Sequence, residues 1–133
     1  MEVRCDLARI IIFEYRDQQV IMLRERGGTR VLQIVIGSSE ALAIDRRLKG
    51  ITLERPQTHE LLAGVIESLG AEVEKIVITE LRRGTFFARI VLRRSGEVVE
   101  IDSRPSDAIA LGAGLETPIY VSEQVLREAA TTP

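Results

Sequence analysis

The sequence predicts an α+β domain built on a mostly antiparallel β-sheet. In the first third, apolar runs follow one another with only glycine or short polar turns between them, as in a meander of hairpins. Helical patterns then alternate with further hairpins, an order that favours an antiparallel sheet with packed helices. The 133 residues suffice for one domain with a substantial core. We therefore expect a single domain over 1–133, with its core at 2–130 and a frayed tail at 131–133.

The first three strands are predicted by apolar runs and the turns between them. The first run ends in Ile10–Phe13, and a polar turn at 16–18 separates it from the second. Gly27 and Gly28 mark a hairpin into the third run. Runs that are apolar at consecutive positions are typical of strands covered on both faces. The expected strands are 2–14, 20–23 and 31–36.

Capping signals and glycines delimit the helices. A glycine, two serines and Glu40 predict a helix start at 37–40, with the hydroxyls as caps, and Gly50 predicts that helix's end. A stripe of aliphatic residues predicts the second helix, which Gly70 ends. The expected helices are 38–49, 58–69, 106–113 and 122–130. Alternation, with turns at 83–84 and 95–96, predicts strands at 73–81, 85–93, 98–103 and 118–121.

Composition excludes several functional classes. The charge of −2, from 18 basic and 20 acidic residues, argues against a nucleic-acid binder driven by net charge, although not against a local basic patch. The single cysteine, Cys5, lies in a strand-like segment and is expected to be buried and unreactive. We find no signal peptide and no apolar run of the length that spans a membrane, so we expect a cytoplasmic protein.

The segment 101–111 carries the strongest functional signal, because polar residues precede an almost wholly apolar helix. Asp102 and Asp107 could converge on a divalent cation such as Mg²⁺, which would activate water for phosphodiester hydrolysis. The alternative is structural: Asp107 caps the helix, and Asp102 pairs with Arg55 or Arg104. Polar groups at the mouth of a buried helix need partners in either case.

His59 is the only histidine and therefore the one candidate for histidine-dependent proton transfer. The alternative is a solvated residue in the first turn of a helix. A zinc site is not expected from one histidine and one cysteine. Arg55 and Arg104 each precede a proline and a helix start, where free amides attract anions. We expect the two arginines to share a phosphate site.

Four blocks of sequence together resemble the bifunctional nuclease (BFN, DNase/RNase) domain family. The blocks are 36–44, 55–62, 85–90 and 102–111, and the resemblance spans about residues 2–130. It implies a compact α+β domain, a homodimer, DNase and RNase activity, and nucleic acid as the substrate. The family pattern has aspartate where Glu60 stands, a change that keeps the carboxylate.

The resulting hypothesis is a nuclease that hydrolyses phosphodiester bonds in DNA or RNA. The catalytic candidates are His59, Glu60, Asp102 and Asp107, with Asp102 and Asp107 also the metal candidates, and the phosphate-binding candidates are Arg55, Arg104 and Ser106. Whether a divalent cation is needed stays open. The alternative is a non-catalytic dimeric interaction or regulatory module in which the same groups form a structural network. The acidic charge and few aromatics favour this alternative, and the extent of the resemblance favours the nuclease.

Overall fold

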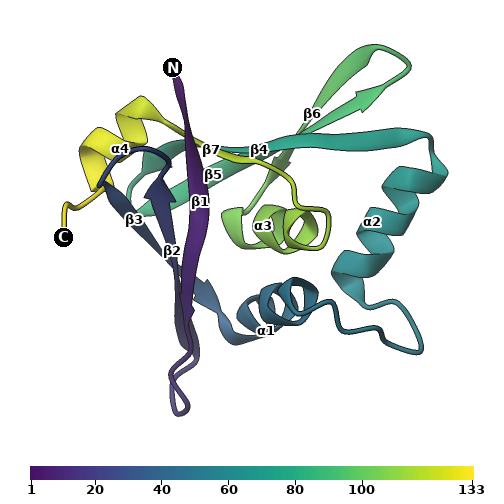
Figure 1. Cartoon of the computed structure of the whole chain (residues 1–133), viewed down its shortest axis with the longest axis horizontal. Coiled ribbons are helices and arrows are strands. Elements are labelled where there is room, and N and C mark those ends of the chain that lie inside the picture. Colours follow the sequence, from purple (N-terminus) through teal and green to yellow (C-terminus); the bar gives the residue numbers. More distant parts are fainter.

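The computed structural model describes residues 1–133 and confirms the α+β class. Seven strands form one sheet in the order β3-β2-β1-β7-β4-β5-β6, accompanied by four helices (Figure 1). The strands are β1 Glu2–Ile11, β2 Gln18–Glu25, β3 Val31–Gly37, β4 Ala71–Arg82, β5 Thr85–Arg94, β6 Glu97–Ser103 and β7 Ile119–Ser122. The helices are α1 Ser38–Leu48, α2 Thr58–Ser68, α3 Pro105–Ala113 and α4 Glu123–Ala129.

Two antiparallel halves make up the sheet, and β7 joins them. β1, β2 and β3 form one meander, and β4, β5 and β6 form the other. β7 pairs antiparallel with β1 and parallel with β4, which is the one parallel pairing. The last strand in the chain therefore lies in the middle of the sheet, between two strands that are far apart in the sequence.

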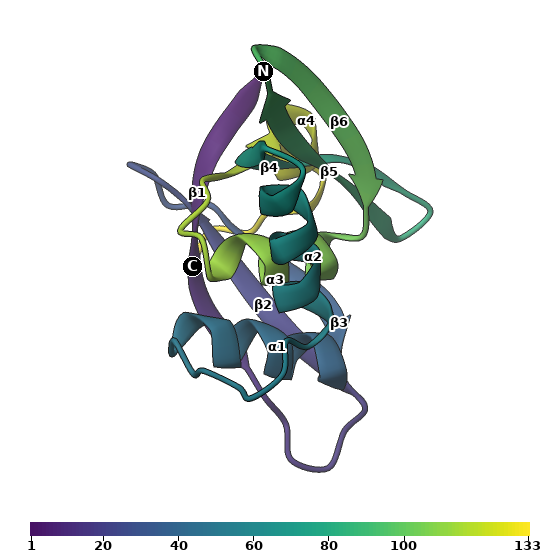
Figure 2. The ribbon, with the colours of Figure 1, turned by 90° about the vertical axis from the view of Figure 1, so that its right-hand side faces the viewer.

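The helices cover the sheet unevenly. α1, α2 and α3 lie together below β4, whereas α4 lies apart near the N-terminus (Figure 1). In the perpendicular view α2 stands in front of α3 (Figure 2). Seven of the nine residues of α3 are buried, as its apolar sequence predicts. The polar residues at the start of α3 are thus held at the edge of the core, where the site described below is built.

Three sequence predictions about helix ends and the tail need correction. No hydroxyl caps α1: Gly37 is its N-cap, and the Ser38 hydroxyl donates to the Asp17 carbonyl instead. α3 also begins without a side-chain cap, at Arg104. Thr131 is not frayed, because it exchanges two backbone hydrogen bonds of 2.8 Å with Val31. These side chains and this backbone are used in tertiary contacts, which local signals do not reveal.

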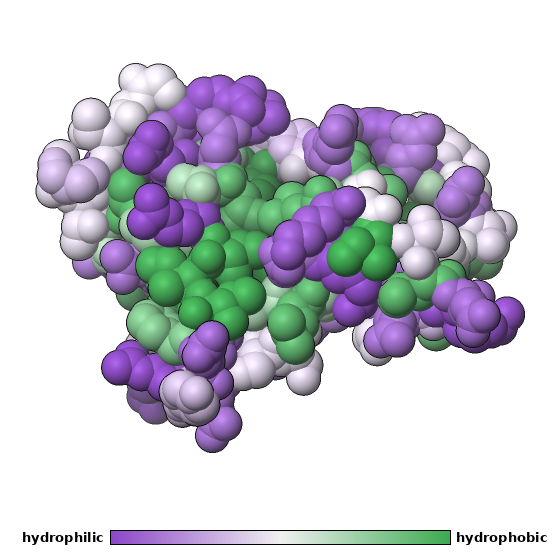
Figure 3. Space-filling view, turned by 60° about the horizontal axis from the view of Figure 1, so that its bottom comes forward, coloured by the Kyte–Doolittle hydropathy of each residue, from purple (hydrophilic) through white to green (hydrophobic).

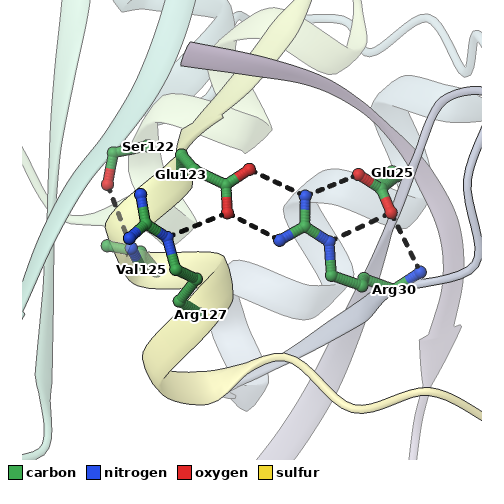
Figure 4. A network of polar contacts seen from close by, with 6 residues as sticks. All are labelled: Glu25, Arg30, Ser122, Glu123, Val125 and Arg127. Carbon is green, nitrogen blue, oxygen red and sulfur yellow. Dashed lines mark hydrogen bonds and ion pairs between the residues drawn. The ribbon is translucent and has the colours of Figure 1, made fainter. Parts of the chain in front are cut away.

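An ionic cluster fastens α4 to the β2–β3 hairpin (Figure 4). The Arg30 guanidinium donates to Glu25 at 2.7 Å and to Glu123 at 2.7 Å. Glu123 also accepts from Arg127, while the Ser122 hydroxyl caps α4 by accepting from the Val125 amide. The hydrogen bonds from Arg30 lower the pKa of Glu123 to about 2. The cluster therefore holds the β2–β3 hairpin and α4 together through charge-assisted bonds.

None of the four helices is long and apolar enough to cross a membrane.

Candidate functional site

The site lies where the first turns of α2 and α3 meet. Pro105 occupies the first turn of α3, where its missing N–H costs nothing, and so brings α3 directly off the end of β6. His59 comes from the first turn of α2. The His59 Nε2 and Asp107 Oδ1 atoms are 3.0 Å apart, which links the two helix starts.

Arg104 completes the cluster from the other side of the carboxylate. Its Nε donates to Asp107 Oδ2 at 2.9 Å, and its guanidinium lies 3.9 Å from Glu40. Asp107 therefore has one oxygen on His59 and the other on Arg104. The Arg104 side chain is still 65% exposed, so it remains available to an anion. We refer to these three residues as the His59–Asp107–Arg104 cluster.

The cluster keeps the Asp107 carboxylate ionised. Burial alone would raise the pKa of Asp107, but the hydrogen bonds from His59 and Arg104 outweigh it and hold that pKa below its usual range. An ionised carboxylate only accepts hydrogen bonds, so the Nε2 of His59 is the donor. In the neutral form of the ring, Nδ1 is then the acceptor, and no group of the chain donates to it. This arrangement leaves one basic nitrogen free for chemistry.

A groove of about 610 Å³ opens beside the cluster, between α2 and β6. One end is polar and includes all three members of the cluster. The rest is an aliphatic floor made by Leu62, Ile66, Ile90 and Ile101. A volume of this size is typical of small-ligand sites, in which a few polar groups converge beside an apolar wall.

Asp102 lines the same groove and is exposed, but its side chain makes no hydrogen bond and no ion pair. The structural alternative for the two aspartates is therefore wrong in both parts. Asp102 pairs with neither arginine, and Asp107 binds His59 and Arg104 instead of capping the helix. Because the buried start of α3 faces α2, tertiary partners replace the local cap.

The structure separates two other candidates from the groove. Glu60 turns toward Arg46 at 3.2 Å and Arg47 at 3.5 Å. Burial raises the pKa of Glu60, but the hydrogen bond from Arg46 and the neighbouring positive charges lower it by more. The net shift of the pKa is therefore downward. Arg55 is exposed in the loop before α2, makes no ion pair and does not line the groove.

Ser106 is the last candidate, and it lies on another side of α3. The residue is 5% exposed and lines a second pocket that the groove does not include. Of the seven candidates, His59, Asp102, Arg104 and Asp107 thus surround one groove.

Sequence reasoning missed Arg47, which binds the C-terminal part of α3. Its Nε donates to the Ala110 carbonyl at 2.6 Å, and a terminal nitrogen donates to the Leu111 carbonyl at 2.9 Å. A signal existed: α3 has no basic residue in its last turn, so its free carbonyls need donors from elsewhere. Glu60 completes this second network and thereby has a structural role.

The side chains at the groove do not fit a divalent cation site. Nowhere in the chain do three histidine, cysteine, aspartate or glutamate side chains come together as metal ligands would. Only Asp102 and Asp107 are carboxylates at the groove, and both oxygens of Asp107 are engaged. Since Mg²⁺ prefers six oxygen ligands, we derive no chemical step through a metal.

Residues 21–133 match the family model for the bifunctional nuclease domain. The chain belongs to the bifunctional nuclease domain family. All members of the His59–Asp107–Arg104 cluster lie within the matched range. This bifunctional nuclease domain also has β1, which precedes that range and lies between β2 and β7 in the sheet.

Two kinds of relatives are similar to this domain. An uncharacterized protein of Mycobacterium tuberculosis is 40% identical over 114 residues, which cover 86% of this chain and 68% of the relative. The protein named bifunctional nuclease 1 of Oryza sativa is 25% identical over 80% of this chain and 33% of its own length. Its namesake in Arabidopsis thaliana is 25% identical over 83% of this chain and 35% of its own length.

Proposed function

We propose that this domain hydrolyses phosphodiester bonds in nucleic acid and that the His59–Asp107–Arg104 cluster is its chemical centre. The observation that carries the proposal is the 3.0 Å contact between His59 Nε2 and Asp107 Oδ1 at the head of the groove. Family membership supports the same class of substrate. The plant relatives named bifunctional nucleases support it less directly, because this chain matches only about a third of their length.

The geometry suits general base catalysis by His59. Its Nδ1 takes the proton of an attacking hydroxyl, either water or a ribose 2′-OH, as the new oxygen–phosphorus bond forms. The bond from phosphorus to the leaving oxygen breaks, and that oxygen takes a proton from the imidazolium or from solvent. Asp107 holds the ring in the required tautomer and stabilises the imidazolium. Arg104 neutralises the charge that develops on the phosphoryl oxygens.

The test is a nuclease assay on highly purified protein, with separate DNA and RNA substrates and with EDTA in a parallel arm. We expect His59→Asn to lower the cleavage rate by about 100-fold or more, and Arg104→Ala to raise the KM most strongly. Asp6→Asn is the matched control, because Asp6 belongs to an exposed ion pair with Arg26 that does not line the groove. Contaminating nucleases are recognised by activity in a mock preparation from cells that do not express the protein.

A second candidate function is the non-catalytic module. The observation that favours this function is that the cluster satisfies its own polar groups: His59 is 8% exposed, and both Asp107 oxygens are hydrogen-bonded. In this case the cluster only fastens α2 to α3. Purified wild-type protein would then cleave no nucleic acid, while His59→Asn would still lower its melting temperature.

We infer that the domain is a homodimer. Leu61, Val65 and Leu69 are expected on the apolar stripe of α2, yet all three are exposed. Val35 is also 57% exposed, so one face of β3 is not covered within the chain. Hydrophobic side chains further gather on the underside of the molecule, where the β1–β2 hairpin and α1 lie (Figure 3). Apolar surface of this extent is typical of an interface.

A further inference from the structure

Arg104 lines two pockets. The first is the groove between α2 and β6. The second has a volume of about 400 Å³ and lies between β3, the β4–β5 turn and the start of α3. Arg104 is the only residue that contributes to both pockets.

The two pockets differ in chemistry. The groove has an aliphatic floor, whereas the second pocket carries amide and hydroxyl groups from Gln18, Gln33, Thr85 and Ser106. Ser106 is 5% exposed, and its hydroxyl lines the pocket without a hydrogen bond to another group of the chain. Because that hydroxyl is not sealed from solvent, it is free to bind a ligand that enters the pocket. The unpartnered hydroxyl beside the exposed cation of Arg104 therefore indicates a site for a polar, anionic group.

We propose that the substrate is a single strand of nucleic acid that crosses Arg104. One unpaired base lies on the aliphatic floor of the groove, its phosphodiester binds Arg104, and the adjacent nucleotide enters the pocket with Ser106. The proposal rests on the nuclease function proposed above and narrows its substrate class. Both pockets fall in the volume range of nucleotide-sized ligands.

The charges at the two pockets favour an unpaired base over a duplex. Duplex binding draws its affinity from many phosphate contacts, whereas Arg104 is the only arginine or lysine that lines either pocket. The domain's affinity must then come from burial of a base against Ile90 and Ile101. A paired and stacked base reaches such a floor only after it is extruded from the helix, which has an energetic cost. A single strand already offers its bases.

The test compares binding of two probes to the His59→Asn variant, which removes cleavage. The probes are a fluorescent DNA strand of about 10 nucleotides and the same strand annealed to its complement. We expect the single strand to bind at least about tenfold more tightly, with the same preference in cleavage by the wild type. Equal affinity and equal cleavage of the two probes would overturn the single-strand assignment while leaving the nuclease function intact. Absence of both binding and cleavage would overturn both.

Two matched substitutions in β6 then test where on the protein the base binds. Ile101→Ser changes the groove floor, whereas Val98→Ser changes an exposed residue of β6 that does not line the groove. We expect Ile101→Ser to weaken single-strand binding about tenfold, Val98→Ser to leave it unchanged, and Ser106→Ala to weaken it several-fold. Equal effects of the two β6 substitutions would overturn the placement of the base. A second result would also overturn it: Ile101→Ser is monomeric in light scattering but keeps its affinity for the single strand. The groove would then be a subunit interface.

Discussion

His59 of α2 and Asp107 of α3 are 48 residues apart in the sequence, and their side chains lie 3.0 Å apart. A contact between two helix starts constrains both the position of α2 and the orientation of the imidazole. It also uses a carboxylate that would otherwise be solvated or would cap its own helix. The pair therefore links α2 to α3 and leaves the other ring nitrogen, Nδ1, without a hydrogen-bond partner in the chain.

Removal of metal should leave cleavage intact. Because the groove offers two carboxylates, of which Asp107 is fully paired, we expect activity to persist in EDTA. Asp102→Asn should retain most activity, and Asp107→Asn should lose it, because only Asp107 holds His59. Cleavage rates of both variants with and without EDTA check this. Loss of activity in both variants and in EDTA would restore the two-aspartate metal mechanism.

Arg47→Met should destabilise the protein without a primary effect on substrate binding. The Arg47 side chain is 8% exposed, and its loss leaves the carbonyls of Ala110 and Leu111 without these donors. We expect a cost of about 1–3 kcal/mol in the free energy of unfolding. Arg93→Met is the control, because Arg93 is an exposed partner of Glu74 and its loss should change stability by about 0.5 kcal/mol or less. Urea unfolding of both variants decides; equal stabilities would refute the role of Arg47.

Acid should weaken the attachment of α4. The pKa of Glu123 falls from its ordinary 4.5 to about 2 in the folded protein, because of the hydrogen bonds from Arg30. The unfolded chain thus binds a proton at a higher pH than the folded chain does. The stabilising contribution is complete above pH 4.5 and is lost as the pH falls toward 2. Urea midpoints between these pH values should fall more steeply in the wild type than in Glu123→Gln, and parallel slopes would contradict this account.

If the domain is a homodimer, its mass should be that of two chains, and a charge on the exposed face of α2 should separate them. Light scattering at micromolar concentration should give twice the 14.8 kDa of one chain. Val65→Lys places a charge on the exposed stripe of α2 and should yield monomers, whereas Gln124→Lys on α4 should not. A wild-type mass near 14.8 kDa would refute the dimer.

Local signals in the sequence predict most of the elements but not their arrangement. The expected ends at Gly50 and Gly70 are confirmed, with φ of 67° and 75°, because glycine tolerates this conformation. The position of β7 between β1 and β4 depends on pairings between distant segments, which no local pattern specifies.

For the candidate site too, the sequence identifies the main residues but not all of their contacts. The polar segment before a buried helix identifies Asp107 and Arg104, and the only histidine identifies His59. The roles of Glu60 and Arg47 depend on how α1 packs beside α3, which follows from tertiary structure alone. A phosphate-binding role for Arg55 stays a prediction, since the residue lies in a loop outside the groove.

We propose that His59, oriented by Asp107, transfers the proton during phosphodiester cleavage. The most direct test is the single-turnover cleavage rate of a short single-stranded substrate by folded wild type, His59→Asn and Asp6→Asn, prepared identically. We expect a rate lower by about 100-fold or more in His59→Asn and an unchanged rate in Asp6→Asn. A His59→Asn protein that folds and cleaves at the wild-type rate would contradict it.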